Sequence, residues 1–260
     1  ESIIKLILKI MNEGFKEAFE KTKIAGSIAA GALDEVSKII KPGISTVEID
    51  KICYEFINDN KAYSAPLFYR GFPKSCCTST NHVVCHGIPS EKILEGDIVN
   101  VDVTAFKDGW HGDTSRMFNI GEISIKAEKL IKTTYESMMK AISIVKNGIF
   151  LGDIGSTIQK HVEDQGFSVV QDFCGHGIGE TFHKEPNVLH YGEKGTGEKI
   201  KTGMIFTIEP MINLGNYETK TLNDGWTAVT KDKSLSAQFE HTIGVTKDGY
   251  EIFTQSNKAS

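Results

Sequence analysis

Residues 97–120 read DIVNVDVTAFKDGWHGDTSRMFNI, a pattern typical of two antiparallel β-strands joined by a tight turn at Lys107-Asp108-Gly109. If the turn centres on residues 107 and 108, Asp102 faces Asp113 across the strands at about 5 Å, where like charges repel. A cation held between the two carboxylates is one reason for such a pair. If the turn instead centres on residues 108 and 109, the register shifts and the two aspartates are unrelated.

Outward from this hairpin, the chain alternates between helical and strand-like patterns. Apolar residues at helical spacing predict helices over residues 3–40, 46–60, 125–146 and 151–165. Apolar runs predict further strands over residues 169–174, 204–212, 227–230, 238–245 and 250–254. Helix-rich stretches precede strand-rich ones twice, which predicts an α+β fold with antiparallel pairing in two similar halves.

Composition and charge exclude several classes of protein. The chain has 260 residues, of which 40% are hydrophobic, and a formal net charge of -5 from 29 basic and 34 acidic residues. This balance provides no positive field to hold nucleic acid non-specifically. The five cysteines have no regular spacing and fit neither a disulfide framework nor a zinc ribbon, which favours a reducing compartment.

The amino-terminal residues bear on membrane targeting. Residues 1–11 are mostly apolar but contain Lys5 and Lys9, and lysines within an apolar stretch argue against a signal peptide. No apolar run reaches the roughly 18 residues that span a bilayer. We therefore expect a cytoplasmic protein without a membrane partner or a specific nucleic acid partner.

One histidine and two glutamates stand in sequence surroundings that suit a metal site. His176 lies in the segment CGHGIG, residues 174–179, where the glycines let other groups approach closely. Glu209 and Glu240 lie in apolar, strand-like segments, and burying a carboxylate there costs free energy unless it is paired or bound to metal. The alternative for each glutamate is a position on the solvent-facing side of its strand.

Four carboxylates and one imidazole together form a candidate metal site: Asp102, Asp113, His176, Glu209 and Glu240. Two divalent cations would neutralise the four negative charges, and two metals about 3.5–4 Å apart form a common hydrolytic site. Bound metal lowers the pKa of water toward ~7, so a bridging hydroxide is available at neutral pH. Oxygen-rich ligands with one imidazole favour Mn, Co, Fe or Zn without choosing among them.

The motifs that carry these residues resemble those of type I methionine aminopeptidases, metallopeptidases of the pita-bread (M24) family. The resemblance runs from about residue 24 to residue 253 and rests on six segments in the same order: CHGIP (85–89), DIVNVD (97–102), GWHGDTS (109–115), CGHGIG (174–179), FTIEPM (206–211) and SLSAQFEHT (234–242). It implies two pseudo-symmetric halves with a central curved antiparallel sheet flanked by helices. The catalytic domain would span residues 24–255, and residues 1–23 would form an N-terminal helical segment without a firm match.

The same resemblance implies removal of the initiator methionine from nascent proteins and peptides through a metal-bridging hydroxide. It implies that the five candidate ligands bind two divalent ions (Co, Mn, Fe or Zn), and that a monovalent cation binds near Asn81, Val83 and Ser236. We expect a monomer that contacts the ribosome transiently.

Roles for the other site residues also follow from the resemblance. Glu209 would take the proton of the attacking water, and His86 and His183 would act in catalysis and contact the substrate. The methionine pocket would be formed by Tyr69, Phe72, Cys77, Phe182 and Trp226. Many relatives have tyrosine at the position of Phe72 and cysteine at that of Pro66, so the fine shape of the pocket is open. Taken singly, each aromatic residue would instead be expected in the core.

Two other functions fit part of the pattern. A proline-specific dipeptidase or creatinase relative on the same fold would have a similar ligand set, and cleavage of Xaa-Pro peptides would reveal it. A binding module that lost its activity would lack ligands, yet all five candidates are present. Among the remaining histidines, we expect His82, His161 and His190 at the surface or in loops. His111 and His241 adjoin ligands in sequence but should point to the opposite strand faces.

Overall fold

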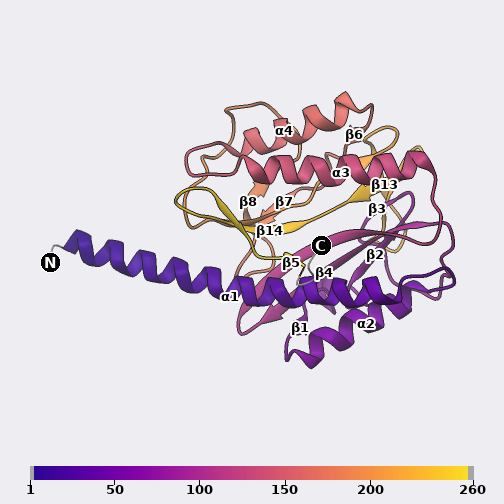
Figure 1. Ribbon diagram of the computed structural model, residues 1–260, viewed down its shortest axis with the longest axis horizontal. Coiled ribbons are helices and arrows are strands. Elements are labelled where there is room, and N and C mark those ends of the chain that lie inside the picture. Colours follow the sequence, from indigo (N-terminus) through magenta and orange to yellow (C-terminus); the bar gives the residue numbers. More distant parts are fainter. Residues whose placement is uncertain (1–2, 257–260) are drawn as a thin grey trace.

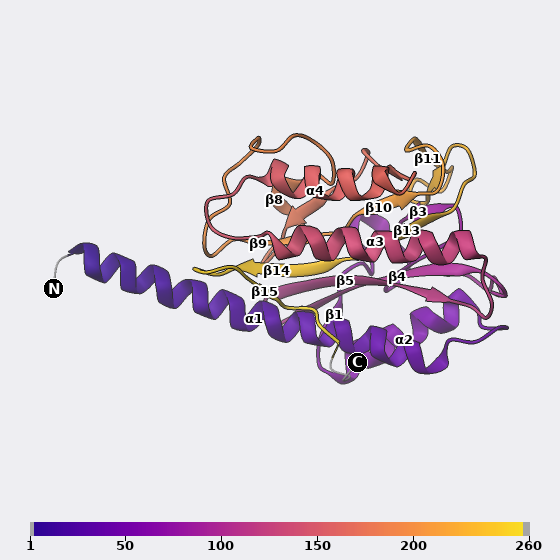
Figure 2. The same cartoon turned by 45° about the horizontal axis from the view of Figure 1, so that its top comes forward.

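Helices form the two outer layers of the structure, and antiparallel strands lie between them (Figures 1 and 2). The computed structural model describes residues 3–256. The first half contains α1 (Ile3–Ile39), α2 (Thr46–Asp59), β1 (Tyr63–Ser64), the 3-10 turn η1 (Tyr69–Gly71), β2 (Cys77–Thr80), β3 (Val83–Cys85), β4 (Ile98–Lys107) and β5 (Trp110–Asn119).

The second half begins with α3 (Ile125–Ser143) and α4 (Leu151–Asp164). Its strands are β6 (Ser168–Val169), β7 (Gly175–Gly177), β8 (Lys184–Val188), β9 (Ile205–Ile208), β10 (Met211–Asn213), β11 (Thr219–Thr221), β12 (Ala228–Thr230), β13 (Ser236–Gln238), β14 (His241–Val245) and β15 (Tyr250–Ile252). In one sheet β5 pairs with the whole of β4, and β1 and β2 pair with different parts of β4. The others have the orders β13-β10-β6, β11-β12-β3 and β15-β14-β9-β7-β8.

The four predicted helices are confirmed, with ends that differ by a few residues. The predictions of single strands over residues 204–212 and 238–245 are wrong, because each divides into two strands that lie in different sheets. The predicted strand over residues 169–174 is reduced to β6. Strands β7 and β8 were not predicted, since GHG and KEPNV are rich in residues that disfavour strands.

The turn between β4 and β5 lies at Asp108-Gly109, one residue later than the register with facing aspartates requires. Both residues have positive φ, 48° and 89°, as a two-residue hairpin turn of type I′ needs. Asp-Gly is a favoured pair for this turn because glycine adopts positive φ without steric cost. The chemistry of the turn therefore sets the register of the whole hairpin.

In this register Asp102 pairs with Ser115, and Asp113 pairs with Thr104. Of the two registers considered, the one that pairs Asp102 directly with Asp113 is therefore wrong, and the alternative turn at residues 108 and 109 is the one observed. The two aspartates nevertheless share one face of the sheet as diagonal neighbours, because residues two apart on a strand point to the same side.

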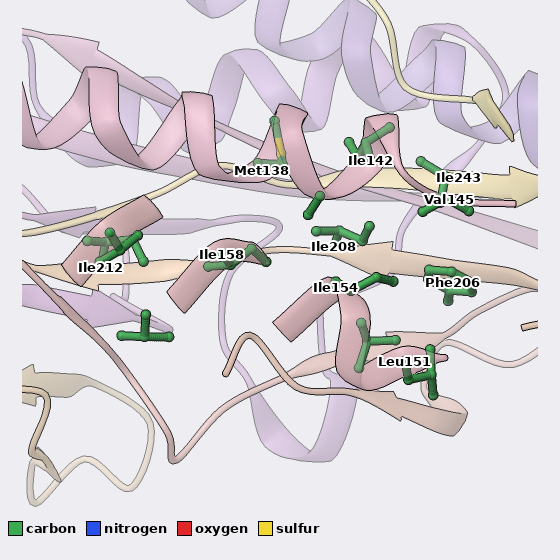
Figure 3. Packing of buried hydrophobic residues seen from close by; sticks show 14 of the residues in the cluster. Met138, Ile142, Val145, Leu151, Ile154, Ile158, Phe206, Ile208, Ile212 and Ile243 are labelled. Atoms are coloured by element: carbon green, nitrogen blue, oxygen red, sulfur yellow. The ribbon is translucent and has the colours of Figure 1, made fainter. Parts of the chain in front are cut away.

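Each half has its own hydrophobic core on the helical side of its strands. In the first half, α1 and α2 pack on β4, where Val99, Val101 and Val103 are fully buried. In the second half, α3 and α4 pack on β9 and β14 around Phe206, Ile208 and Ile243, among others (Figure 3). Because side chains alternate along a strand, the polar residues of β4 between these valines point away from the helices.

Polar contacts between the strands join the two halves. Ser115 of β5 forms an isolated antiparallel bridge with Glu240. The Thr242 hydroxyl donates to the carbonyl oxygen of Asp113 at 2.7 Å and accepts the N–H of the same residue at 3.0 Å. Asn100 of β4 donates from Nδ2 to the carbonyl oxygen of Gln238 at 2.7 Å. The carboxylates of the two halves are thereby held close together.

Helix α1 is continuous across residue 23, where the sequence suggested the start of the catalytic domain. Residues 1 and 2 of the predicted N-terminal segment lie outside the described residues, and the boundary itself stays a prediction. Phe19 contacts Phe253 at a ring-centroid distance of 5.0 Å. Further along, α1 packs so tightly on β5 that a Cβ atom on Gly112 would lie 2.2 Å from the backbone nitrogen of Gly26. Among residues 3–256, no helix combines the length and apolarity needed to cross a membrane.

Candidate active site

The polar face of β4 and β5 supplies the first pair of carboxylates. The Thr104 hydroxyl donates to Asp113 Oδ1 at 2.7 Å, which orients that carboxylate. Burial raises the pKa of Asp102 well above its usual range, and the charges of Asp113 and Glu209 raise it further. The two aspartates of the first half therefore lie close enough to the second half to interact with its acidic groups.

The second pair of carboxylates lies at an interruption between strands. Along the chain β9 is followed by β10, and β13 is followed by β14. The β9–β14 pairs and the β10–β13 pairs have the same register. If the pairing continued between them, Glu209 would lie opposite Glu240. Pro210 follows Glu209 and has no N–H to donate, which accounts for the interruption. Both glutamates thus lie where hydrogen-bonded pairing between the strands is interrupted, a place called the open ladder below.

Groups from other segments satisfy the backbone at this interruption. The N–H of Glu209 donates to Nε2 of His190 at 3.1 Å, and Gln238 Nε2 donates to the Glu209 carbonyl oxygen at 3.3 Å. The N–H of Glu240 donates to the carbonyl oxygen of Ser115 at 3.2 Å. Buried backbone groups need such partners, so these contacts stabilise the open ladder.

His176 lies on β7 between two glycines, and the backbone packs closely around it. A Cβ on Gly175 would lie 2.4 Å from the carbonyl oxygen of Thr207, and one on Gly177 would lie 2.2 Å from that of Glu185. His176 Nδ1 lies 3.0 Å from the carbonyl oxygen of Gly177, which can only accept, so Nδ1 carries the proton of the neutral ring. Nε2 is then left with its lone pair, as a metal ligand requires.

The imidazole faces one carboxylate from each half. His176 Nε2 lies 3.6 Å from Asp113 Oδ2 and 3.4 Å from Glu209 Oε1. Atoms of Asp113, His176 and Glu240 that could bind metal all lie within 4.8 Å of one another. Burial lowers the pKa of His176, but the nearby carboxylate of Asp113 and the charge of Glu209 outweigh this effect and raise the pKa to about 9.

The electrostatics of the cluster fit bound cations. Both carboxylate oxygens of Glu240 are buried without a hydrogen-bond partner. Burial raises the pKa of Glu240 well above its usual range, as do the charges of the other three acids. Burial also raises the pKa of Glu209, to about 7, against the opposing charge of His176. Because buried carboxylates are stabilised by cations, this donor set fits divalent metal ions.

A cavity of about 410 Å³ opens onto this cluster. Four of the five candidate ligands reach its wall, the exception being the more deeply buried Glu240. The residues expected to form the methionine pocket or contact substrate also line it: Tyr69, Phe72, Cys77, His86, Phe182, His183 and Trp226. A larger cavity of about 960 Å³ lies near Lys140 and His161, away from the carboxylates. The smaller cavity is the candidate active site because it contains the reactive groups.

Aromatic contacts hold the walls of this cavity in place. Tyr69 and Phe182 meet at a centroid distance of 4.9 Å, and the rings of Phe182 and His183 stack at 4.0 Å with 10° between their planes. Phe72 and Trp226 pack edge to face at 5.2 Å. A pocket with aromatic walls and a thiol, from Cys77, suits a flexible apolar side chain.

The two histidines of the cavity differ in their surroundings. His183 Nδ1 lies 3.1 Å from the Tyr69 hydroxyl oxygen. Burial lowers its pKa to about 4, with help from the positive charge of His176, so the ring is neutral near pH 7. His86 has a positive φ of 57° and packs edge-on against Phe173. Burial likewise lowers the pKa of His86.

Sequence reasoning missed several groups that support the candidate ligands. His190 lies in the loop after β8, one of the two expected places, but its side chain is fully buried against Glu209 rather than exposed. The Thr207 hydroxyl donates to Glu209 Oε1 at 2.8 Å and accepts the His176 N–H at 3.0 Å. Gln238 Nε2 lies 3.2 Å from Glu209 Oε2. Thr207 and Gln238 each lie two residues from a predicted ligand, and that spacing along a strand was an available signal.

The remaining predictions concern residues outside the cluster. Asn81 and Ser236 are adjacent, since the Ser236 N–H donates to the Asn81 carbonyl oxygen at 2.9 Å, and Val83 lies on the neighbouring β3. His82 is exposed, as expected, whereas His161 is partly buried on α4. His111 and His241 bond to Gly179 and Thr254, respectively, outside the carboxylate cluster.

Sequence comparison identifies the family. The profile of metallopeptidase family M24 matches residues 20–247, most of the chain. The chain belongs to metallopeptidase family M24. An M24 metallopeptidase with this cluster of carboxylates binds divalent metal ions, and the predicted family membership is confirmed.

Several proteins similar to this chain over nearly its whole length are methionine aminopeptidases. The chain is 57% identical to the enzyme of Rickettsia prowazekii, over 92% of this chain and 93% of that protein. It is 55% identical to the enzyme of Escherichia coli, over 92% of this chain and 91% of that protein. The crystal structure of the Rickettsia prowazekii enzyme matches with a TM-score of 0.91 at 56% identity, over 92% of this chain and 98% of that one.

The predicted fold is also confirmed by these matches. The prolidase of Pyrococcus furiosus, at 22% identity, has a TM-score of 0.74 over 94% of this chain and 65% of its own, and this likeness concerns the fold alone. The architecture is therefore the α+β pita-bread fold of family M24.

Proposed function

We propose that the protein removes the N-terminal methionine of peptides and nascent chains by metal-dependent hydrolysis. One observation carries this proposal: an aromatic, thiol-containing cavity opens directly onto a cluster of four carboxylates and one imidazole. The cavity supplies a place for one apolar side chain, and the cluster supplies a place for cations beside it. Identity of more than half to methionine aminopeptidases over nearly the whole chain supports the choice of substrate.

Two divalent ions, Mn, Co, Fe or Zn, would be held by Asp102, Asp113, His176, Glu209 and Glu240. Four carboxylates and one neutral imidazole match the total charge of two such ions. The unpartnered oxygens of Glu240 support bound metal, since a buried carboxylate without any hydrogen bond is stabilised by a cation. When bound, the metals would generate a nucleophile from water and polarise the scissile carbonyl.

Glu209 is the residue best placed to move a proton. Its carboxylate reaches the cavity wall, and Thr207 and Gln238 each donate a hydrogen bond to one of its oxygens. Oriented in this way, it would accept a proton from the attacking water and pass it to the leaving amine. The free amine of the substrate would meet the negative cluster, which restricts cleavage to the chain end.

His183 would act as a hydrogen-bond donor to the reacting amide. When the Tyr69 hydroxyl donates to Nδ1, the neutral His183 ring carries its proton on Nε2. Stacking on Phe182 limits rotation of the ring, so the donor is held in one orientation. His86, which lines the cavity near Trp226 and Phe173, would contact the backbone beyond the scissile bond.

An activity assay on a methionyl tripeptide tests this proposal. Activity should disappear after chelation and return when Mn, Co, Fe or Zn is added singly. A matched panel of Xaa-Pro peptides should remain uncleaved. Cleavage of the Xaa-Pro panel with no cleavage of methionyl peptides would assign the site to a proline-specific enzyme. No activity with any of these metals would support a binding protein instead.

We also propose finer properties that rest on less structure. The five cysteines are free, which supports a reducing compartment such as the cytoplasm. A monomer, a transient contact with the ribosome, and a monovalent cation near Asn81, Val83 and Ser236 complete the proposal. Sedimentation of the purified protein and co-sedimentation with ribosomes would test the first two. The dependence of activity on K⁺ or Na⁺ would test the third.

A further inference from the structure

One charged side chain in the lining of the candidate active-site cavity has no role in the function proposed above. Arg70 lies in η1, and of the described residues that line the cavity it is the one lysine or arginine. Arg70 is exposed, whereas the candidate ligands Asp113 and His176 are buried. Arg70 therefore lies at the solvent side of the cavity, and the ligands lie at its inner end.

The backbone and an aromatic ring hold Arg70 in this place. Its φ of 48° and ψ of 31° are left-handed, which is uncommon for residues other than glycine. The N–H of Phe72 donates to the carbonyl oxygen of Tyr69 at 2.9 Å, and the N–H of Phe68 donates to that of Phe72 at 2.8 Å, which fixes the turn. The guanidinium carbon lies 5.3 Å from the centroid of the Tyr69 ring, a cation–π contact. Uncommon backbone conformations of this kind concentrate at functional sites.

The charge of Arg70 is not balanced by an acidic side chain. In the described part of the chain, its guanidinium has neither an ion pair nor a hydrogen bond. Asp172, a charged residue of the lining outside the carboxylate cluster, accepts a hydrogen bond from the Thr219 hydroxyl. Divalent ions bound as proposed would balance the four carboxylates of the cluster. Arg70 is then a cation of the cavity that is left to pair with an anionic group of a ligand.

We propose that Arg70 determines specificity, by binding an acidic side chain among the residues that follow the N-terminal methionine of the substrate. This inference rests on the proposed function. With the amine at the carboxylate cluster and the methionine side chain in the aromatic pocket, the rest of the peptide must leave toward solvent. Tyr69 connects Arg70 to the start of that path, because its ring contacts the guanidinium and its hydroxyl oxygen lies 3.1 Å from His183 Nδ1.

The two proposed substrate-binding histidines give the departing peptide two differently charged sides. Arg70 lies on the side of His183, through Tyr69. Asp172 lies on the side of His86, whose ring packs on the adjacent residue, Phe173. Successive side chains of an extended peptide point to opposite sides. We therefore expect an acidic residue to be favoured at a position that faces Arg70 and not at the next one.

Kinetics with matched peptides test the inference. Amidated methionyl pentapeptides would carry Glu or Gln at position two, three or four and be otherwise identical, so the members of each pair differ in one charge. The full-length, metal-loaded enzyme should cleave the Glu peptide with a kcat/KM about two- to fivefold higher at one of these positions, the range expected for an exposed ion pair. High salt should bring this ratio close to one, because salt screens exposed charges.

Substitutions assign the preference to Arg70. Arg70→Gln should bring the Glu-to-Gln ratio to about one, Arg70→Lys should keep part of the preference, and Arg70→Glu should reverse it. Both peptides meet the same enzyme sample, so partial unfolding of a variant would not change the ratio. The matched control is Lys184→Gln, which should keep the wild-type ratio. Lys184 is exposed and follows His183 in sequence but does not line the cavity.

The possible failures are distinguishable. Equal cleavage of the Glu and Gln peptides at all three positions would overturn the inference and leave the proposed function standing. The inference is also wrong if the preference persists in Arg70→Gln, or if Lys184→Gln removes it to the same extent, because other charges would then cause it. Failure to cleave any methionyl peptide would overturn the proposed function, and this inference with it.

Discussion

The two halves of the molecule place their carboxylates by different means. In the first half, the ladder of β4 and β5 is unbroken, and Asp102 and Asp113 meet as diagonal neighbours on one face. In the second half, the ladder opens where Glu209 and Glu240 would face each other directly. Both arrangements bring two acids to one point.

The difference shows which half depends more on hydrogen bonds from side chains of other segments. The ladder of β4 and β5 is continuous, and besides the Thr104 hydroxyl at the Asp113 carboxylate, its support at Asp113 comes from the Thr242 hydroxyl, which bonds the backbone of that residue. The open ladder relies on His190, Gln238 and Ser115 for hydrogen bonds that neighbouring strands would otherwise supply. Substitutions around the glutamates should therefore have larger effects than matched substitutions around the aspartates.

Glu209→Gln should have the largest effect of any change in either half. Loss of the proton-accepting carboxylate should lower kcat on a methionyl tripeptide by about 10²–10⁴-fold. Metal content, measured by elemental analysis, must be matched to wild type so that loss of metal is not mistaken for loss of chemistry. Near-normal turnover at full metal occupancy would rule out this role for Glu209.

Removal of metal should make the junction of the halves sensitive to pH. His176 faces Asp113 and Glu209, and its folded pKa of about 9 exceeds the usual value of about 6.5. The metal-free folded state thus keeps a proton that the unfolded state loses, and the free energy of unfolding should fall by about 2–3 kcal/mol between about pH 6.5 and 9. Urea unfolding of chelated protein measures this, and His176→Asn should flatten the dependence. If the free energy of unfolding falls equally with pH in wild type and in His176→Asn, the pH dependence arises from other groups.

A matched pair of threonines compares the two ladders directly. Thr104 bonds to a carboxylate of the unbroken ladder at 2.7 Å, and Thr207 bonds to one of the open ladder at 2.8 Å. Each Thr→Val change should weaken metal binding by about 10–100-fold, as loss of a ligand-orienting hydrogen bond does. Thr207→Val should be the more severe, since Thr207 also accepts the His176 N–H. Titration with Mn would measure both, and an equal loss would contradict the proposed asymmetry.

His190→Leu should have the smallest effect, and it should be on stability. The change removes the acceptor of the Glu209 N–H while keeping an apolar side chain in a fully buried position. Leaving that N–H unpaired should lower the free energy of unfolding by about 1–3 kcal/mol. The exposed His82 is the control, and His82→Leu should change stability by less than about 0.5 kcal/mol. Unchanged stability in His190→Leu would mean that the open ladder does not need this partner.

Local patterns predicted much of the fold and the candidate ligands. The four helices followed from apolar spacing, because a helix that packs on a sheet must be apolar on one side. The five candidate ligands were recognisable because each is an acid or imidazole in unusually apolar or glycine-rich surroundings. The strand breaks at Glu209 and Glu240 were not predicted, since the apolar pattern runs through them and only the loss of pairing reveals the interruption. The full burial of the loop residue His190 was not predicted, because burial depends on segments distant in the chain.

The sequence by itself determined the residue types that can bind metal, the helices, and the type of turn at Asp108-Gly109. Only the tertiary structure decided which residues face one another. The register of β4 and β5 follows from the turn geometry, and it moved Asp102 from a direct to a diagonal neighbour of Asp113. His176 contacts one acid from each half. This contact requires the two halves, each with its own hydrophobic core, to meet along the polar faces of their strands. Local chemistry selects candidate residues, whereas distance between them depends on how segments far apart in the chain pack.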